Sequence, residues 1–213
     1  MESTLNALDM TQLVALAAAL GFGSGMRLYA VVFLTGAAGA LGWVPLPPGL
    51  AVLQNPILMT VSGVLVALEF FADKIPALDS IWDTVHTFIR IPAGAALAAA
   101  VFGGDHATWA VVAGLLGGTL AATAHTAKAS TRAAVNTSPE PFSNIGLSLL
   151  GDVSVPALLW LAWEHPFWFF AALAVALVVA VALIVVMFRF VRALWRRVRG
   201  GKVDPEPVAA LPR

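Results

Sequence analysis

The residues best suited to chemistry lie in one stretch, positions 69–90, between two almost purely apolar sequences. From Asp79 to Arg90 its ionisable residues are spaced by four, three and four. Residues three or four apart share one face of a helix, so this spacing predicts a charged stripe on a single helix. Such a stripe could hold a cation, relay protons or pair with other charges. The ionisable residues of the stretch are Glu69, Asp73, Lys74, Asp79, Asp83, His86 and Arg90.

A second stripe follows further along the chain and is basic. Its members are spaced by three, four and four: His125, Lys128, Arg132 and Asn136. Polar side chains in a membrane helix must face protein or water rather than lipid. Together with Asp152, the two stripes predict a polar cavity that opens to the cytoplasm and handles a small ion or solute. The alternative is a charge-balanced network that only holds helices together.

Two narrower sites are compatible with the same residues. Arg27, Lys128 and Arg132 form a candidate anion site, for example for a lipid phosphate, because guanidinium groups bind phosphate with two hydrogen bonds. Carboxylates and imidazoles suit Mn, Zn or Fe, so a metal site is the alternative, with these candidate ligands: Asp79, Asp83, His86 and His125. The chain has no cysteine and no HExxH motif, so no resident cofactor is expected.

The composition places these charges in a membrane protein. Of the 213 residues 60% are hydrophobic and 11% are charged, whereas soluble domains carry about 25% charged residues. The mean hydropathy is +0.88, and several apolar runs approach the roughly 20 residues that span a bilayer. The lipid bilayer is therefore the expected partner. The basic run at 189–202 is interpreted as an orientation signal that contacts anionic lipid, and no nucleic-acid partner is expected.

The apolar runs predict six transmembrane spans, at about 11–38, 56–72, 79–102, 107–135, 145–163 and 167–188. The third span must begin near Asp79, because its apolar part, 91–103, is too short to cross alone. Residues 11–199 are expected to form one transmembrane helical domain. A cytoplasmic N-terminal segment is expected at 1–10, and a disordered cytoplasmic tail at 200–213.

The distribution of basic residues predicts the orientation of the chain. Ten of the twelve Lys and Arg residues lie in 73–90, 128–132 and 189–202. Loops on the cytoplasmic side of a membrane are enriched in Lys and Arg. We therefore expect a multi-pass protein of the bacterial inner membrane with both termini in the cytoplasm.

The six spans divide into two halves, at about 11–103 and 105–190, which would have opposite orientations in the membrane. Shifting the chain by 96 residues places Gly21 on Gly117, within two glycine-rich runs. Glycine weakens helices, so we expect an all-α membrane protein of about six helices, with an inverted three-plus-three repeat and broken first and fourth helices as the favoured arrangement. Close packing of helices through small residues is the alternative explanation of the glycines. A homodimer is also compatible with the sequence.

The charged blocks resemble a known family. Residues 69–83 contain E-x-x-x-D-K-I-P-x-x-D-S-x-W-D, and R-x-P-x-G follows at 90–94. This block is similar to that of the bacterial integral membrane family catalogued as domain of unknown function 4126. The run H-x-x-K-x-x-x-R at 125–132, with Asn136, Asn144 and Asp152, is similar to the family's second block. The resemblance covers roughly residues 10–165 and implies an integral membrane protein, without supplying an activity.

A weaker similarity links Glu69, Asp73 and Lys74 to cation exchangers, in which two inverted three-helix halves each carry Glu-x-Gly-Asp-Lys/Arg. In this chain the spacing from Glu to Asp is one residue longer, and the glycine is missing. Glu164, at the corresponding place in the second half, is not followed by Asp-Lys. Cation exchange is therefore an analogy only.

The sequence thus predicts a small secondary transporter or channel for a proton, a cation or a small charged solute. Two alternatives from other classes stay open. One is a non-transporting scaffold or accessory membrane protein whose charges are structural. The other is a membrane enzyme that acts on a lipid headgroup, with Asp79, Asp83 and His125 as metal or acid–base groups.

Overall fold

The computed structural model describes residues 8–103, 106–135 and 141–200, and these residues contain helices and no strand. The expected all-α class is therefore confirmed. The predicted tail at 200–213 lies outside the described residues except for its first residue, and so does most of the predicted segment at 1–10. In chain order the elements are α1 (Met10–Ala40), η2 (Pro48–Gln54), α2 (Pro56–Ala72), α3 (Pro76–Phe102), α4 (Ala107–Val135), α5 (Pro141–Glu164) and α6 (Pro166–Gly200).

Proline and capping residues set the helix starts. Helices α2, α3, α5 and α6 each begin at a proline, which lacks the N–H group that the first turn leaves unpaired. Helix α3 consequently begins at Pro76, three residues before the expected start at Asp79. Asp9 caps α1 in a capping box, because the Gln12 backbone amide donates to the Asp9 side chain at 2.7 Å and the Asp9 backbone amide donates to the Gln12 side chain at 3.0 Å.

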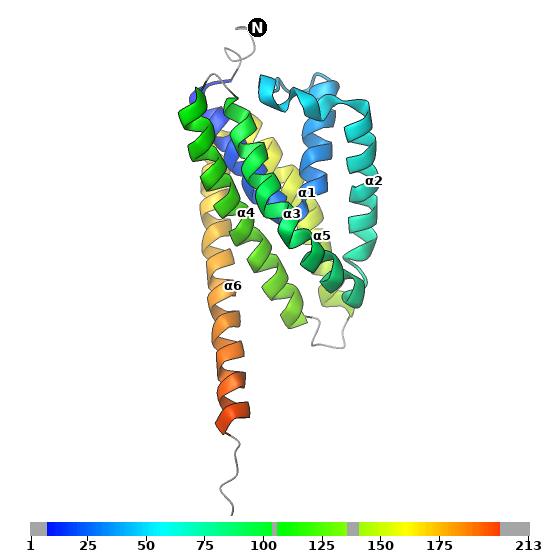
Figure 1. Ribbon diagram of the computed structural model, residues 1–213, viewed down its shortest axis with the longest axis vertical. Helices are drawn as coiled ribbons and strands as arrows, with labels where there is room; N and C mark the ends of the chain where they lie inside the picture. The colour runs from blue at the N-terminus through cyan, green and yellow to red at the C-terminus, as the bar shows by residue number, and fades with distance from the viewer. Residues whose placement is uncertain (1–7, 104–105, 136–140, 201–213) are drawn as a thin grey trace, which may run out of the picture.

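Helix α1 is a helical hairpin rather than a straight span. Its backbone leaves helical geometry at Arg27, where φ is −148° and ψ is 82°. Figure 1 shows α1 descending to the middle of the molecule and returning to the end where it began. A Cβ built on Gly23 would lie 2.8 Å from Cγ2 of Val31, whereas a straight helix separates these positions by about 12 Å. The expected break in the first helix is present, but it falls at Arg27 and not in the glycine run.

The glycines bring three helices into backbone contact. A Cβ built on Gly21 would lie 2.6 Å from Cα of Gly117, and one on Gly94 would lie 2.7 Å from Cβ of Ala121. Helices α1, α3 and α4 therefore pack at a spacing that only small residues permit, as the alternative explanation predicted. Helix α4 continues unbroken from Ala107 to Val135, so the expected break in the fourth helix is wrong.

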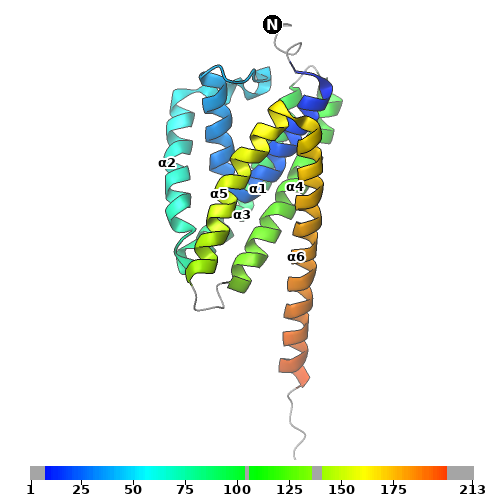
Figure 2. The same ribbon diagram turned by 180° about the vertical axis from the view of Figure 1, so that it is seen from behind.

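Helices α2 to α6 alternate in direction, and α6 extends well beyond the other helices (Figure 1). Because α1 doubles back, the start of α1 and the end of α6 lie at opposite ends (Figures 1 and 2). We call these the η2 end, which is upper in Figure 1, and the basic end, where α2 meets α3 and α6 terminates. This arrangement differs from the straight first span that was expected, while the number of crossings and the side on which each terminus lies stay predictions.

The packing of the two halves differs. Helix α3 packs closely on both α1 and α4, whereas α6 packs mainly on α4 and touches α1 little. Helix α2 packs on α1, but its counterpart α5 hardly contacts α4 and lies on α1 instead. An inverted repeat would make these pairs equivalent, so the contacts do not reproduce the twofold relation that was expected.

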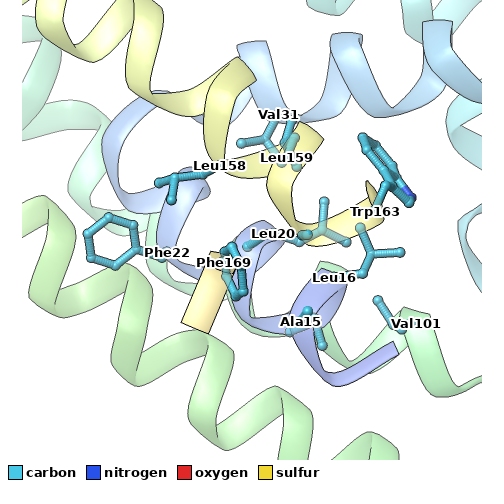
Figure 3. Close-up of a cluster of buried hydrophobic side chains, with 14 of the residues drawn as sticks. Ala15, Leu16, Leu20, Phe22, Val31, Val101, Leu158, Leu159, Trp163 and Phe169 are labelled. Carbon is cyan, nitrogen blue, oxygen red and sulfur yellow. The ribbon is translucent and has the colours of Figure 1, made fainter. Parts of the chain in front are cut away.

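The apolar core occupies the half of the molecule nearer the η2 end. Figure 3 shows side chains from α1 meeting those of α5 and α6, among them Leu16, Leu20, Val31, Leu159 and Phe169. Large apolar side chains also cover the outer surface; Phe88 is 82% exposed and Val178 is 70% exposed. Five described helices are long and apolar enough to cross a membrane, or six if the bent pair η2 and α2 is included. The protein is thus a multi-pass membrane protein whose outer apolar face suits lipid.

The hairpin in α1 predicts the sidedness of three positions, and the cysteine-free chain allows each to be tested by a single added cysteine. Met10→Cys and Trp43→Cys should react with a membrane-impermeant maleimide from one side of the membrane, and Arg196→Cys should react from the other. All three side chains are exposed. Labelling of Met10→Cys and Arg196→Cys from the same side would support the six-crossing arrangement instead.

Candidate functional site

Eight charged side chains from five helices meet around the bend of α1. Four are cations and four are acids, so the formal charges of this described cluster cancel. Six of the side chains are at most 7% exposed, while Lys128 is 12% and Asp152 is 23% exposed. We call this set the charge network: Arg27, Glu69, Asp73, Asp83, Arg90, Lys128, Arg132 and Asp152.

Asp73 is the centre of the network and is fully buried. Its carboxylate lies 2.7 Å from Nη2 of Arg27, 3.4 Å from Nζ of Lys128 and 3.4 Å from Nη2 of Arg132. Arg132 also donates to the Asp73 backbone carbonyl at 2.6 Å. Because Asp73 caps the end of α2, these contacts join α2 to α1 and α4. A buried carboxylate requires such compensation, since an unpaired charge is costly in a low-dielectric interior.

Arg27 stands at the apex of the α1 hairpin and reaches two other helices. Besides Asp73, its Nη2 lies 3.0 Å from Asp152 and donates to Ser148 Oγ at 3.1 Å and to the Ser148 carbonyl at 3.2 Å. These contacts occupy the place that a continuing helix would take. The break in α1 thus coincides with a cation that is tied to α2 and α5.

Arg90, on α3, forms a second group of ion pairs, which is connected to the group around Asp73. Its guanidinium lies 2.5 Å from Glu69 and 2.6 Å from Asp83. Lys128 joins the group around Arg90 to the group around Asp73, because its ammonium lies 3.2 Å from Asp83 and also lies near Asp73. The predicted acidic and basic stripes therefore do face each other, and their charges are paired across α2, α3 and α4.

The two histidines take different positions. His125 lies beside the network, with Nε2 2.6 Å from Thr87 Oγ1 and Nδ1 3.4 Å from Arg90 Nη1. His86 points instead to α1, where Nε2 lies 2.8 Å from the hydroxyl of Tyr29, and its ring stacks on Trp82 at 4.2 Å. Among the described side chains, no three His, Asp or Glu come together as metal ligands.

Of the other predicted residues, Lys74 has its own partners outside the charge network. The ammonium of Lys74 donates to the carbonyl of Phe70 at 3.0 Å and lies 2.9 Å from the centre of its ring; burial lowers the pKa of this ammonium below its usual value. The side chain of Asp79 and the whole of Asn136 lie outside the described residues. Their proposed roles in the metal site and in the polar cavity stay predictions.

Three buried carboxylate oxygens of the network have no hydrogen-bond partner among the described residues: Glu69 Oε2, Asp83 Oδ2 and Asp152 Oδ2. Buried polar atoms are nearly always satisfied by protein or water. A small cavity of about 200 Å³ lies between α3 and α4, and of these three acids only Asp83 lines it, together with residues such as Thr87 and His125. These oxygens could accept a proton, a water molecule or a cation.

A larger cavity, of about 960 Å³, lies on the other side of the network between α1, α4, α5 and α6. Sequence reasoning did not find it, because it depends on the separation of α4 from α5. Sequence reasoning also missed Tyr29, Thr87 and Ser148. Tyr29 is the only tyrosine of the chain and lies two residues after Arg27, which was the available signal.

Helices with apolar outer faces and an internal charge network define a polytopic α-helical membrane protein. Residues 14–186 match the family described as "Domain of unknown function (DUF4126)". This match covers most of the chain, so the protein belongs to that family, as its charged blocks indicated. No curated protein and no solved structure matches the chain.

Removing one member of a buried ion cluster should destabilise the fold, because its partners stay charged. We expect Arg90→Met to lower the free energy of unfolding by about 3–5 kcal/mol, since Glu69 and Asp83 lose their cation. Unfolding by SDS in mixed micelles measures this change. The double variant Glu69→Gln/Arg90→Met should recover part of the loss. Arg192→Met, at an exposed position of α6, is the matched control and should be close to neutral; an equal effect of both single variants would contradict the prediction.

Proposed function

We propose that the protein is a small secondary transporter or channel of the bacterial inner membrane that moves a proton or a small cation through the charge network. The observation that carries the proposal is the set of buried, unpartnered carboxylate oxygens in this network, next to a broken helix. Discontinuous helices near the middle of the bilayer form substrate and ion sites in many transporters. Helix α1 bends at a place that is away from both ends of the molecule (Figure 1).

Stability alone is a weak reason for such a network. Replacing a buried ion cluster by well-packed apolar residues is often neutral or stabilising, and ionisable groups are rare within membranes. Here eight described charges converge where apolar contacts would suffice to hold helices together. Their retention supports a role in which the pairing changes during activity.

The network contains the parts of a proton or cation relay. Protonation of Glu69 or Asp83 would weaken its pair with Arg90, and Lys128 lies within 4.0 Å of both carboxylates and could exchange between them. His125 lines the small cavity beside Asp83 and Thr87. A neutral imidazole can take up and release protons near physiological pH. The path would run from this cavity through Asp83 and Arg90 to Glu69.

The basic residues supply the orientation. The basic end of the molecule contains the turn between α2 and α3, to which Lys74 belongs, and the last turn of α4, to which Arg132 belongs. The basic turns of α6 extend in the same direction. This end would therefore face the cytoplasm. The C-terminal end of α6 would then be cytoplasmic, and the start of α1 would lie at the opposite face. This orientation replaces the expectation that both termini are cytoplasmic.

A flux assay tests the proposal directly. Purified protein in liposomes should carry protons, or one of Mg²⁺, Mn²⁺ and Ca²⁺, faster than empty liposomes, as measured by pH-sensitive and metal-sensitive dyes inside the vesicles. Glu69→Gln and Asp83→Asn keep the side-chain shapes and remove the charge, so we expect at least roughly a tenfold loss of flux, as for the loss of a proton-transfer group.

The control is Glu164→Gln, at an exposed position at the end of α5, which should retain the wild-type flux. Variants that stay monodisperse and folded yet transport normally would contradict the relay. If Glu69→Gln and Asp83→Asn fail to fold while Glu164→Gln folds, the structural interpretation of the network is the better one.

A further inference from the structure

We infer that the cavity of about 960 Å³ between α1, α4, α5 and α6 binds one anionic phospholipid from the cytoplasmic leaflet. This site shares Lys128 and Arg132 with the charge network but does not require ion transport, and its assignment to the cytoplasmic leaflet rests on the orientation proposed above. The volume lies at the upper end of the roughly 300–1,000 Å³ that is usual for ligand sites.

The wall of the cavity is suited to an acyl chain. Alanine, valine and leucine side chains of α5 and α6 make up most of it, and on α6 it extends from Trp168 to Leu183. At 1.5 Å per residue this is a length of about 22 Å. The hydrocarbon layer of one leaflet is about 15 Å thick, so the acyl chain of a phospholipid fits along this wall. Because α4 and α5 hardly touch, the cavity is not closed between these helices.

The charges that reach the cavity are all positive. Among the described residues that line it, the ionisable side chains are Arg27, Lys128 and Arg132. The carboxylates of Asp73 and Asp152 pair with these cations but do not line the cavity. A ligand in the cavity therefore meets cations first, with the acids behind them. Arginine and lysine in this arrangement favour phosphate, which arginine binds with two hydrogen bonds.

Two of the cations lie near the end of the molecule that would face the cytoplasm, where the headgroup of a lipid would be. Lys128 and Arg132 lie in the last two turns of α4, which ends at Val135, at the basic end of the molecule. A lipid whose phosphate contacts them would direct its acyl chain along α6 toward Trp168. A free phosphate would contact the cations and leave the apolar wall uncovered. A zwitterionic lipid would place the positive charge of its own headgroup near these cations. Both features together favour an anionic phospholipid.

Native mass spectrometry of the full chain tests this inference. The detergent-solubilised protein is incubated with phosphatidylglycerol or with phosphatidylcholine of identical acyl chains, and separately with inorganic phosphate. We expect one phosphatidylglycerol per chain, bound at least about tenfold more tightly than phosphatidylcholine, because the choline ammonium of the second lipid would lie near the cations of the site and be repelled by them. Phosphatidylglycerol should also raise the melting temperature, and inorganic phosphate should leave it unchanged.

Two variants on α6 locate the lipid without altering the charge network. Ala176 lines the cavity, so Ala176→Phe should project its ring into the apolar wall and strongly reduce the bound phosphatidylglycerol. Val178 does not line the cavity and is 70% exposed, so Val178→Phe is the matched control and should bind as the wild type does. Arg132→Gln should reduce the preference for phosphatidylglycerol over phosphatidylcholine.

Several results would overturn the inference. Equal retention of the two lipids, or normal phosphatidylglycerol binding by Ala176→Phe, would exclude an anionic lipid at this place. Stabilisation by phosphate alone would indicate a small-anion site. A dimer that Ala176→Phe dissociates would indicate that a second copy of the chain covers the cavity.

Discussion

The contact on which the rest of this structure depends is the ion pair between Arg27 and Asp73. A charged residue at the tip of a helical hairpin inside a membrane is stable only when it has partners. Asp73 and Asp152 supply them from α2 and α5. The pair thus explains how α1 can turn back within the molecule, and it fixes where α2 ends. Lys128 and Arg132 then gather around the same carboxylate.

Apolar contacts and ion pairs occupy different parts of the molecule along its length. Toward the η2 end, apolar side chains such as Leu16 and Phe169 fill the interior, and glycines such as Gly21 allow α1, α3 and α4 to approach closely. Toward the basic end, ion pairs replace apolar contacts. The apolar contacts and close backbone packing hold the bundle rigidly. Paired charges can exchange partners when one of them is protonated, so this half is the one in which a change of state would begin.

The two cavities on either side of the network have different chemistry. The smaller one contacts Asp83 and His125, and the larger one is mostly apolar, with three cations as its charged lining residues. Lys128 and Arg132 belong to the network, and Arg132 lines both cavities. A lipid that binds these cations would compete with Asp73 for them. The lipid site and the ion path would then be coupled through shared side chains, in either direction.

The sequence by itself determined the helical class and the membrane setting, because helix periodicity and hydropathy are local properties. Charge spacing marked most residues of the network, but it gave Arg27 only to an anion site and included Lys74 and His86, which contact other partners. The facing of the two charged stripes also followed from spacing, since unpaired charges in a membrane must find each other. The tertiary structure decided what depends on distant contacts. Arg27, rather than the neighbouring glycines, breaks α1 because its partners come from α2 and α5. That bend places the ends of the described chain on opposite sides, and the separation of α4 from α5 opens a cavity that no local pattern could predict.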